Sequence, residues 1–409
     1  MNDIKAVSNK QSKSLLAIGQ APDLLTQALT ERVHTILQEL VVKEADDFLS
    51  ALSYQRTESR RGYRHGSVHR ELTTSFGKTA FERPRVKVFS KEGGLVEWKS
   101  SLLPRYSRRT QTVDATLMGL YFGGVNTRKV SRALRPLLKG SPLSRATISR
   151  TIAQVHDLFN AWRERDLSEE DIRYLYLDGT YVPMRCGKKV SKLPVLAVIG
   201  VRASGEKVLL DLDILGEESE ESWKSVLEGL SRRGLRRPAM AIVDGNPGLS
   251  SALEKVWPKM DRQRCIVHKI RNLQSHAPKH LRDEIKVDFH SIVYADDLST
   301  ARSAYARVHK KWTRHWEPVA RSLAEAGEEL LTFYKYPSSQ WKALRTTNSI
   351  ERLNEEFKRR TKTQGSFPTA SSVLVILFGL IASGMIRLRK IPGYQDMPPR
   401  RQEALGKST

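Results

Sequence analysis

The chain contains 409 residues, with 69 lysines and arginines and 45 aspartates and glutamates, so its formal net charge is +24. At about 150 residues per domain this length predicts two or three domains, and 39% hydrophobic residues exclude a wholly disordered or fibrous protein. Two cysteines are present, Cys186 and Cys265, which excludes a disulfide scaffold and a four-cysteine zinc module. Such sparse cysteine use favours a reducing, cytoplasmic compartment.

Residues 1–110 predict a mostly helical and basic region. Apolar residues recur at three- and four-residue steps within residues 1–50, a spacing typical of a helix used for interaction or dimerisation. Residues 68–89 instead alternate and carry a Gly77-Lys78 turn, so we expect a short hairpin that ends at Pro84.

Well over half of the net charge lies in residues 51–150, which contain 21 lysines and arginines and 6 acidic residues. Arg60, Arg61 and Arg64 are interleaved there with aromatic and histidine residues, a mixture suited to phosphate contacts and stacking. The alternative is a charged surface that serves solubility alone. The one-sided charge favours a nucleic-acid partner.

Residues 111–165 predict three helices. Ser144 is a candidate N-cap for the third, on which apolar residues from Ile148 to Phe159 share one face. These features predict a helix-turn-helix, with an ordinary helical hairpin as the alternative. The exposed positions at the start of the third helix are of types that reach bases and phosphates in a major groove, namely Arg145, Thr147, Ser149 and Arg150.

The remainder of the chain predicts an α/β domain formed by residues 170–270 and 340–390. Three strand-like runs, at 174–182, 193–201 and 208–215, predict a meander. Two shorter strands, at 239–243 and 264–267, follow with helices between them, and residues 271–339 predict a helical insertion.

Two segments near the end of the chain bear on membranes and flexibility. The apolar run from Val373 to Ile386 has 14 residues, fewer than the roughly 20 that span a membrane. We therefore expect a buried helix and no membrane partner. Residues 391–409 are polar and contain prolines, which predicts a flexible tail.

Three carboxylates occupy positions that suit metal chemistry. Asp178 lies within the first strand, Asp244 ends the fourth, and Glu351 lies in the first turn of a helix at 348–360. A ribonuclease H-like mixed sheet brings acids from such positions together, since its first and fourth strands are neighbours. Mg²⁺ prefers carboxylate ligands, and two ions about 4 Å apart can assist phosphoryl transfer.

Each acid also has an ordinary structural interpretation. Asp178 and Asp244 precede glycines, as turn formers do, and Glu351 follows Asn348 at the spacing of a capping glutamate. Glu355 is a rival for the third carboxylate, one turn further along the same helix. Asp211 and Asp213 are weaker rivals, because alternate strand positions can simply mark a solvent-facing side. The joint order of the three acids beside a basic region favours catalysis.

With these residues identified, the sequence resembles the DDE transposases of the Mutator type, including their bacterial insertion-sequence relatives. The resemblance is carried by RRGYRHGSVHRELTTSFGKTAFERPRVKVF, YFGGVNTRKVSRAL, the strand with Asp178-Gly-Thr, VDGNPGL, CIVHKIRN and TTNSIERLNEEFKRRTKTQGSFP. In these motifs Asp178, Asp244 and Glu351 match the catalytic and metal-binding positions of the family. The resemblance also implies a helical insertion before the catalytic helix.

The resemblance implies a nucleoid-associated enzyme that binds the terminal inverted repeats of its own element and performs Mg²⁺-dependent cleavage and strand transfer, with Mn²⁺ as a possible substitute. Double-stranded DNA, both repeat and target, would be its partner. Two ends must be handled together, which implies a homodimer or a larger synaptic complex. The alternatives are a catalytically silent DNA-binding relative and a ribonuclease H-like structure-specific nuclease.

Further residues are assigned beside these acids. Cys265 and His268 resemble a family motif, and two ligands make a poor zinc site, so we interpret them as packing and DNA-positioning support for the active site. Residues 186–192 are rich in cations and predict either a DNA-contacting hairpin or an exposed turn. A basic run on the helix of Glu351 would line the DNA path: Lys358, Arg359 and Arg360.

Overall fold

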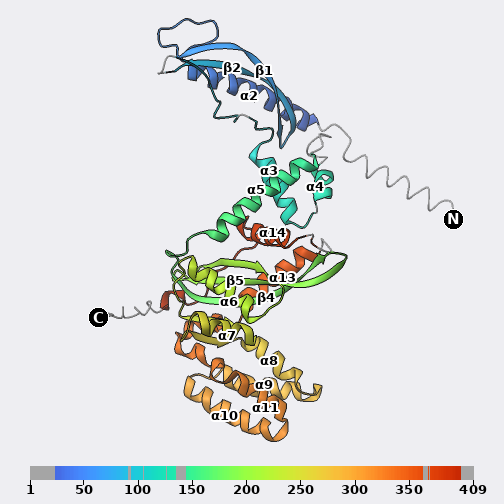
Figure 1. Ribbon diagram of the computed structural model, residues 1–409, viewed down its shortest axis with the longest axis vertical. Helices are drawn as coiled ribbons and strands as arrows, with labels where there is room; N and C mark the ends of the chain where they lie inside the picture. The colour runs from blue at the N-terminus through green and yellow to red at the C-terminus, as the bar shows by residue number, and fades with distance from the viewer. Residues whose placement is uncertain are drawn as a thin grey trace, which may run out of the picture. The chain divides into compact units, whose positions relative to one another are not determined.

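The computed structural model describes residues 24–397 except 91–93, 105, 126, 135–143, 363–366 and 368 (Figure 1). The chain divides into two compact units between residues 153 and 154, within helix α5 (Arg145–Glu164). Both units contain helices, and each has a β-sheet, so the fold is mixed α/β as the sequence predicts.

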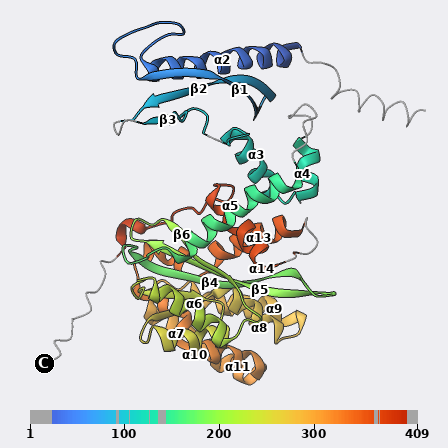
Figure 2. The ribbon, with the colours of Figure 1, turned by 45° about the horizontal axis from the view of Figure 1, so that its top comes forward.

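The first unit begins with a helix packed on a small antiparallel sheet. Helix α2 (Leu24–Leu49) lies along the sheet formed by β1 (Gly62–Thr74), β2 (Gly77–Phe89) and β3 (Leu95–Glu97) (Figure 2). Residues 24–104 are therefore not mostly helical, since β1 to β3 contain 29 residues and α2 contains 26. Two apolar clusters join helix and sheet: Val41, Leu72, Phe81 and Leu103 form one, and Ala45, Leu49, Val86 and Trp98 form the other.

The predicted hairpin is present but is longer than expected. β1 and β2 pair from Gly62 opposite Val88 to Thr74 opposite Gly77. The prediction that the hairpin ends at Pro84 is wrong. Pro84 pairs with Ser67 beside a register shift, and a bulge is a place where a strand accepts a residue that has no N–H to donate.

Three helices complete the first unit. They are α3 (Gln111–Phe122), α4 (Thr127–Leu134) and α5, and their shared core contains Val113, Leu117, Val130, Leu134 and Ile148. Ser144 Oγ accepts a hydrogen bond from the backbone N–H of Thr147 at 3.1 Å, which confirms the predicted N-cap of α5.

The second unit is built on a five-stranded mixed sheet with the order β6-β5-β4-β7-β8. The three long strands form the predicted antiparallel meander, and the two short strands run parallel to β4. Their bounds are β4 (Ile172–Cys186), β5 (Lys189–Arg202), β6 (Lys207–Ile214), β7 (Met240–Val243) and β8 (Asp261–Arg264).

Helices cover both faces of this sheet (Figure 2). On one face, α6 (Glu220–Arg232) and α7 (Pro247–Val256) bury Trp223, Leu227 and Leu253 against Leu175 and Leu177 of β4. On the other face lie α13 (Asn348–Thr361) and α14 (Ala370–Ala382). The apolar run expected to form a buried helix is α14, with seven of its residues buried. None of the helices in the described part of the chain combines the length and apolar composition that crossing a membrane requires.

A helical region follows the last strand. It comprises α8 (Ile266–Ser275), α9 (Arg282–Val293), α10 (Leu298–His315) and α11 (Glu317–Ala326), with the short helices η1 (Lys279–Leu281), η2 (Gly327–Leu330), η3 (Thr332–Lys335), η4 (Ser338–Gln340) and α12 (Trp341–Leu344). Ile266 and Leu273 belong to its apolar core. The strand expected at 264–267 ends at Arg264, because Ile266 buries its side chain on α8 among these helices, and such packing overrides β-propensity.

The beginning of the predicted flexible tail is packed against the second unit. Ile391 is 1% exposed, and Gly393 O accepts a hydrogen bond from Gln340 Nε2 at 2.9 Å. The turn η6 (Tyr394–Asp396) follows, and Asp396 accepts a hydrogen bond from Ser339. The rest of the predicted tail, 398–409, lies outside the described residues.

We predict that the buried ion pair between β6 and the end of α6 is a major determinant of stability. Arg233 lies 2.7 Å from Asp211, and their side chains are 12% and 8% exposed. Asp211→Ala removes the carboxylate that compensates the charge of a buried guanidinium, so we expect the free energy of unfolding to fall by about 3–5 kcal/mol in urea titrations.

A surface pair provides the matched control. Lys224 and Glu228 lie 3.6 Å apart on α6 with side chains 45% and 51% exposed. Glu228→Ala should change the free energy of unfolding by less than about 1 kcal/mol. Equal losses in the two variants would contradict the importance of the buried pair.

Candidate active site

Two of the three predicted acids lie at the same level of neighbouring parallel strands. Tyr176 of β4 is paired with Ile242 of β7, and Asp178 and Asp244 each follow two residues later. Parallel strands are about 4.8 Å apart, and side chains two residues further on point to the same face. The register therefore brings the two carboxylates close together at the end of β7.

Asp178 is a buried acid whose hydrogen-bond donor is an uncharged amide. Its residue is 8% exposed, and its Oδ2 accepts a hydrogen bond from Asn354 Nδ2 of α13 at 2.7 Å. Burial, followed by the negative charge of Asp244, raises the pKa of Asp178 to about 7, although His268 and Asn354 act in the opposite direction. A carboxyl group in this position gains from any cation that compensates for its lost hydration.

Glu351 is held in a network centred on Thr347, a fully buried residue at the start of α13. Thr347 Oγ1 lies 3.3 Å from Glu351 Oε1, 3.1 Å from Cys265 Sγ and 3.3 Å from His268 Nδ1. His268 Nε2 in turn lies 3.4 Å from Glu351 Oε1. Residues from the end of β8, from α8 and from α13 therefore meet in one cluster.

The network raises the pKa of His268. Hydrogen bonding to Cys265 is the largest cause that raises the pKa of His268, to about 9, and the charges of Glu351 and Asp178 raise it further while burial opposes the change. Burial also opposes ionisation of the Cys265 thiol, but hydrogen bonds from His268 and Thr347 outweigh it and lower the thiol pKa. The raised pKa of His268 therefore favours its cationic form close to both Glu351 and Asp178.

The ligand atoms of Cys265, His268 and Glu351 lie within 4.8 Å of one another. Zinc is usually held by four ligands in a structural site. The sulfur already accepts hydrogen bonds from Thr347 N at 3.3 Å and from its hydroxyl at 3.1 Å. This arrangement favours a hydrogen-bonded support for Glu351 over a zinc site.

A further acid, Glu218, was missed in the sequence. It immediately precedes Ser219, the N-cap of α6, within an acidic run that is typical of a helix start. Burial, followed by the charge of Asp244, raises the pKa of Glu218, and Glu218 also contributes to the raised pKa of Asp178. The acids near Asp244 therefore include one that local sequence pattern gave no reason to select.

Comparison with known proteins identifies the family. The chain matches the family described as "Transposase, Mutator family" over residues 4–385. It is 33% identical over 352 residues to the transposase for insertion sequence element ISRM5 of Rhizobium meliloti, covering 86% of each protein. It is 31% identical to the transposase for insertion sequence element IS406 of Burkholderia multivorans, covering 86% of this chain and 89% of the relative. The chain belongs to the Mutator family of transposases.

A third relative within the same range is the transposase for insertion sequence element IS905 of Lactococcus lactis, 32% identical over 85% of this chain and 87% of the relative. The Mutator match extends through both compact units. All residues of the candidate site described above lie inside it. The resemblance identified from the sequence motifs is confirmed at the level of the family.

The rival acids in this Mutator-family chain have other surroundings. Glu355 is exposed on α13, one turn beyond Glu351. Asp211 pairs with Arg233, and Asp213 pairs with Arg163, on a strand separated from β4 by β5. Their carboxylates are occupied in ion pairs that hold α5 and α6 to the sheet.

The predicted DNA contacts differ in their availability. Ser149, Arg150, Arg61 and Lys358 are exposed. Thr147 is partly buried, and its hydroxyl lies 2.9 Å from that of Ser144. Arg64 forms an ion pair with Asp46 of α2, and Arg60 donates to the carbonyls of Gln55 and Gly62. Arg359 and Arg360 lie near Glu356, at 2.5 and 3.9 Å. The side chain of Arg145 lies outside the described part of the chain.

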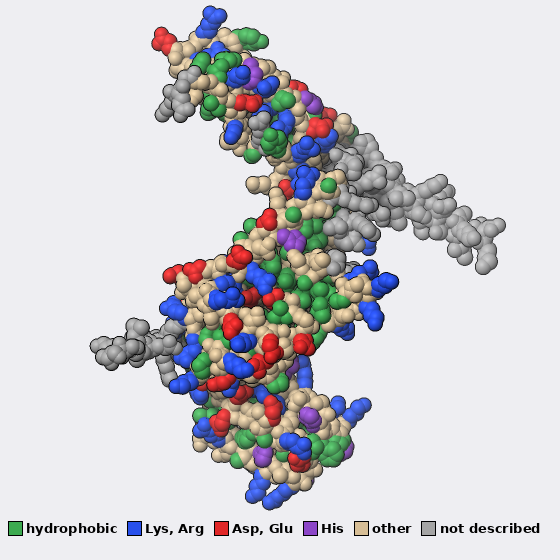
Figure 3. Space-filling view, viewed as in Figure 1, with side chains coloured by type: hydrophobic (Ala, Val, Ile, Leu, Met, Phe, Trp, Pro, Cys, Tyr) green, Lys and Arg blue, Asp and Glu red, His purple; other side chains and the backbone are tan. Residues whose placement is uncertain are grey.

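The cation-rich segment 186–192 forms the tip of the β4–β5 hairpin. Cys186 pairs with Lys189 across the turn, and every residue from 185 to 192 is exposed. Lysine and arginine side chains gather at this tip (Figure 3). The segment is therefore an exposed hairpin tip whose turn lies at residues 187–188, and its contact with DNA stays a prediction.

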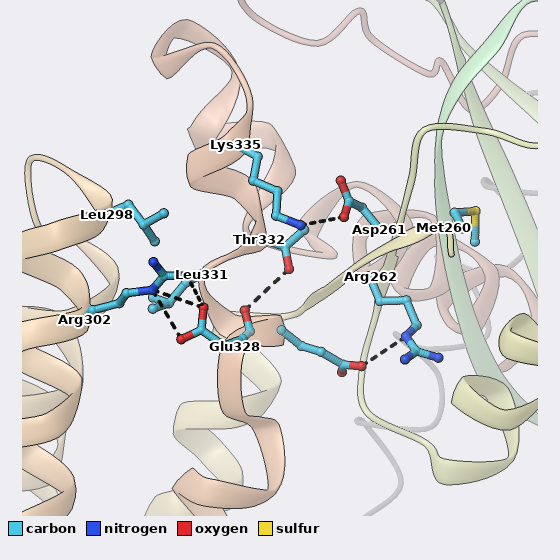
Figure 4. A pocket seen from close by; sticks show the side chains of 10 residues that line it. Met260, Asp261, Arg262, Leu298, Arg302, Glu328, Leu331, Thr332 and Lys335 are labelled. Atoms are coloured by element: carbon cyan, nitrogen blue, oxygen red, sulfur yellow. Dashed lines mark hydrogen bonds and ion pairs between the residues drawn. The ribbon is translucent and has the colours of Figure 1, made fainter. Parts of the chain in front are cut away.

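A pocket of about 280 Å³ lies at the opposite end of the short strands from Asp244 (Figure 4). Its charged side chains pair with one another: Arg302 with Glu328 at 2.8 Å, Lys335 with Asp261 at 2.7 Å and Arg262 with Glu329 at 3.1 Å. The pairs made by Asp261 and Arg262 attach the helical region to β8, and the pair of Arg302 with Glu328 joins α10 to η2 within that region. The pocket belongs to packing and not to the candidate active site.

We predict that the Thr347 hydroxyl stabilises the site. Thr347→Val keeps the shape of the side chain but removes the group shared by Cys265, His268 and Glu351. Loss of this hydroxyl beside the buried Cys265 and the half-buried His268 and Glu351 should lower the free energy of unfolding by about 1–3 kcal/mol in chemical denaturation.

Thr313→Val is the control, because the exposed Thr313 hydroxyl donates only to the helix carbonyl of His309. Its expected effect is within about 0.5 kcal/mol. If both valine variants unfold together with the unmodified protein, the network does not contribute to stability.

Proposed function

We propose that this chain is an insertion-sequence transposase that binds the terminal inverted repeats of its element and cuts and joins DNA with Asp178, Asp244 and Glu351 as catalytic residues. The observation that carries the proposal is the register of β4 with β7, which aligns Asp178 with Asp244. Asn354, on the same helix α13 as Glu351, donates a hydrogen bond to Asp178 at 2.7 Å. Membership of the Mutator transposase family supports the same activity.

We interpret the second unit as a ribonuclease H-like domain. Its support is the strand order β6-β5-β4-β7-β8, in which a meander of three long strands is followed by two short parallel strands. The first strand and the fourth strand of the unit, β4 and β7, are neighbours. This is the arrangement expected of a fold that gathers acids from these two strands and from a later helix.

The donor set fits divalent magnesium. The charge of Asp244 disfavours ionisation of Asp178, and the hydrogen-bond donors of the two acids are neutral: Asn354 for Asp178 and the backbone N–H of Asn246 for Asp244. Oxygen ligands of this kind suit Mg²⁺, which keeps several waters. Two Mg²⁺ ions, or Mn²⁺ in their place, would activate a water or a DNA 3′-hydroxyl and stabilise the leaving oxygen.

The protein groups around these acids would orient them. Asn354 fixes one oxygen of Asp178, and His268 Nε2 orients one oxygen of Glu351 from 3.4 Å. Their hydrogen bonds reduce the rotamer freedom of the carboxylates, and preorganised groups lose less entropy when the substrate binds. Cys265 supports this arrangement through Thr347 and does not face the substrate in this proposal.

DNA binding is assigned to the basic surfaces of both units. In the first unit, α3 to α5 would act as a helix-turn-helix, with Ser149 and Arg150 exposed near the start of α5. In the second, Lys358 and the tip of the β4–β5 hairpin would contact backbone phosphates. Because two ends must be joined, we propose that a homodimer or larger assembly is the active form.

We predict that cleavage and joining depend on all three acids. With labelled DNA carrying the ends of the element, Mg²⁺ should support joining and EDTA should abolish it. Asp178→Asn, Asp244→Asn and Glu351→Gln should each lower the rate by about a thousandfold or more, because metal-assisted charge stabilisation contributes several kcal/mol. Binding to the ends should persist in each variant.

Glu355→Gln is the matched control for Glu351→Gln, since both lie on α13 and Glu355 is exposed. It should retain the unmodified rate. Loss of activity in Glu355→Gln with retention in Glu351→Gln would transfer the third role to Glu355. Binding without cutting or joining in the unmodified protein would favour the silent DNA-binding relative, and cutting of branched DNA without joining would favour the nuclease.

We also predict a steep salt dependence of DNA binding. Six to ten phosphate contacts would reduce affinity by about 10³–10⁵ between roughly 50 and 200 mM salt. Arg61→Ala, which removes an exposed cation, should reduce the slope of log K against log salt by about one. Arg321→Ala on the exposed side of α11 is the control. A flat binding curve would contradict an electrostatic interface.

A further inference from the structure

Glu218 lies immediately against the strand that carries Asp178. A Cβ placed on Gly179 would lie 2.8 Å from Oε2 and 3.0 Å from Oε1 of Glu218. Gly179 directly follows Asp178, so the carboxylate of Glu218 occupies the space that a side chain at position 179 would need. Tyr181, two residues further along β4, donates to Glu218 Oε2 at 3.5 Å.

Glu218 approaches from the sheet face covered by α6 and α7, whereas Asn354 and Glu351 approach from the face covered by α13. β7 ends at Val243, so beyond that residue no strand separates the two faces at Asp244. The backbone N–H of Asn246 holds Asp244 Oδ1 at 2.9 Å, and the same asparagine caps α7 next to the start of α6. The charge of Asp244 consequently raises the pKa of Asp178 on one side and of Glu218 on the other.

A second, independent feature lies beside Asp178 on the α13 face and points to a polar ligand there. Asn354 is 4% exposed and donates its Nδ2 to Asp178, while its Oδ1 has no hydrogen-bond partner among the described residues. Buried polar atoms in native proteins are nearly always satisfied by protein, ordered water or an ion. A hydrated cation beside Asp178 would bring water donors to this oxygen.

We propose that Glu218 is a fourth acidic residue of the cation site, adding its carboxylate oxygens to those of Asp178 and Asp244. This inference rests on the proposed function, because it assigns Glu218 to the same divalent cations. It also explains why glycine follows Asp178: a larger residue at 179 would displace the Glu218 carboxylate.

A glutamate that binds a cation differs from a purely structural one in how its substitution affects stability and metal binding. Without a cation, Glu218 adds a like charge near two others, so Glu218→Gln should stabilise the protein. With a cation, the same substitution removes a ligand or a partner for metal-bound water, so it should weaken binding. Glu218→Gln should therefore raise stability without a cation and weaken cation binding.

The test measures Mn²⁺ binding to the full chain without DNA, by the electron paramagnetic resonance signal of free Mn²⁺. Glu218→Gln should weaken binding by about 10–100-fold, the range for groups that support a metal site. Its urea midpoint in EDTA should be higher than that of the unmodified protein. Glu217→Gln is the matched control, because Glu217 is the exposed neighbour and should change neither quantity.

Glu218→Asp distinguishes the effect of the negative charge from the effect of side-chain length. It retains the charge but withdraws the carboxylate by one methylene, so it should weaken Mn²⁺ binding without the stabilisation seen in Glu218→Gln. Retention of full Mn²⁺ affinity in Glu218→Gln, with loss in Asp178→Asn, would overturn the role of Glu218 and leave the proposed function intact. Absence of Mn²⁺ binding in the unmodified protein, together with absence of joining, would overturn both.

Discussion

The parallel pairing of β4 with β7 is the contact on which the position of the acidic residues depends. It joins a strand from the meander to a short strand that arrives after α6, and it sets Asp178 and Asp244 at one level. The next pairing, β7 with β8, brings Cys265 beside this level, since Cys265 N donates to Val243 O at 2.8 Å. A shift of one residue between β4 and β7 would send the two aspartates to opposite faces.

The helical region between β8 and α13 is long, yet its two ends lie together. Ile266 N donates to Arg345 O at 3.0 Å, just after the chain leaves the sheet and just before it returns. Lys269 pairs with Glu325 at 2.6 Å, which fastens α11 to α8 near this point. The position of Glu351 is therefore determined by contacts at the base of the insertion and not by its full length.

Local patterns predicted what depends on neighbouring residues in the chain. The meander followed from apolar and alternating runs and the start of α5 from Ser144. The candidate acids followed from their positions within a strand, at the end of a strand and in the first turn of a helix; their catalytic roles remain predictions. Glu218 was missed because an acid before a helix is locally ordinary, and its meaning depends on Gly179, 39 residues earlier. The pairing of Arg64 with Asp46 likewise depends on how α2 packs on β1. Such contacts are tertiary, so the spacing of neighbouring residues in the sequence does not predict them.

The two cysteines have opposite environments. Cys265 is buried under Thr347, whereas Cys186 is exposed at the tip of the β4–β5 hairpin among lysines. Thiol reagents therefore distinguish the two without any substitution, and a maleimide dye added to the folded native chain attaches at the hairpin. The protein thus has a natural labelling position on a surface that we propose binds DNA. Cys186 lies at the end of β4, the strand that also contains Asp178.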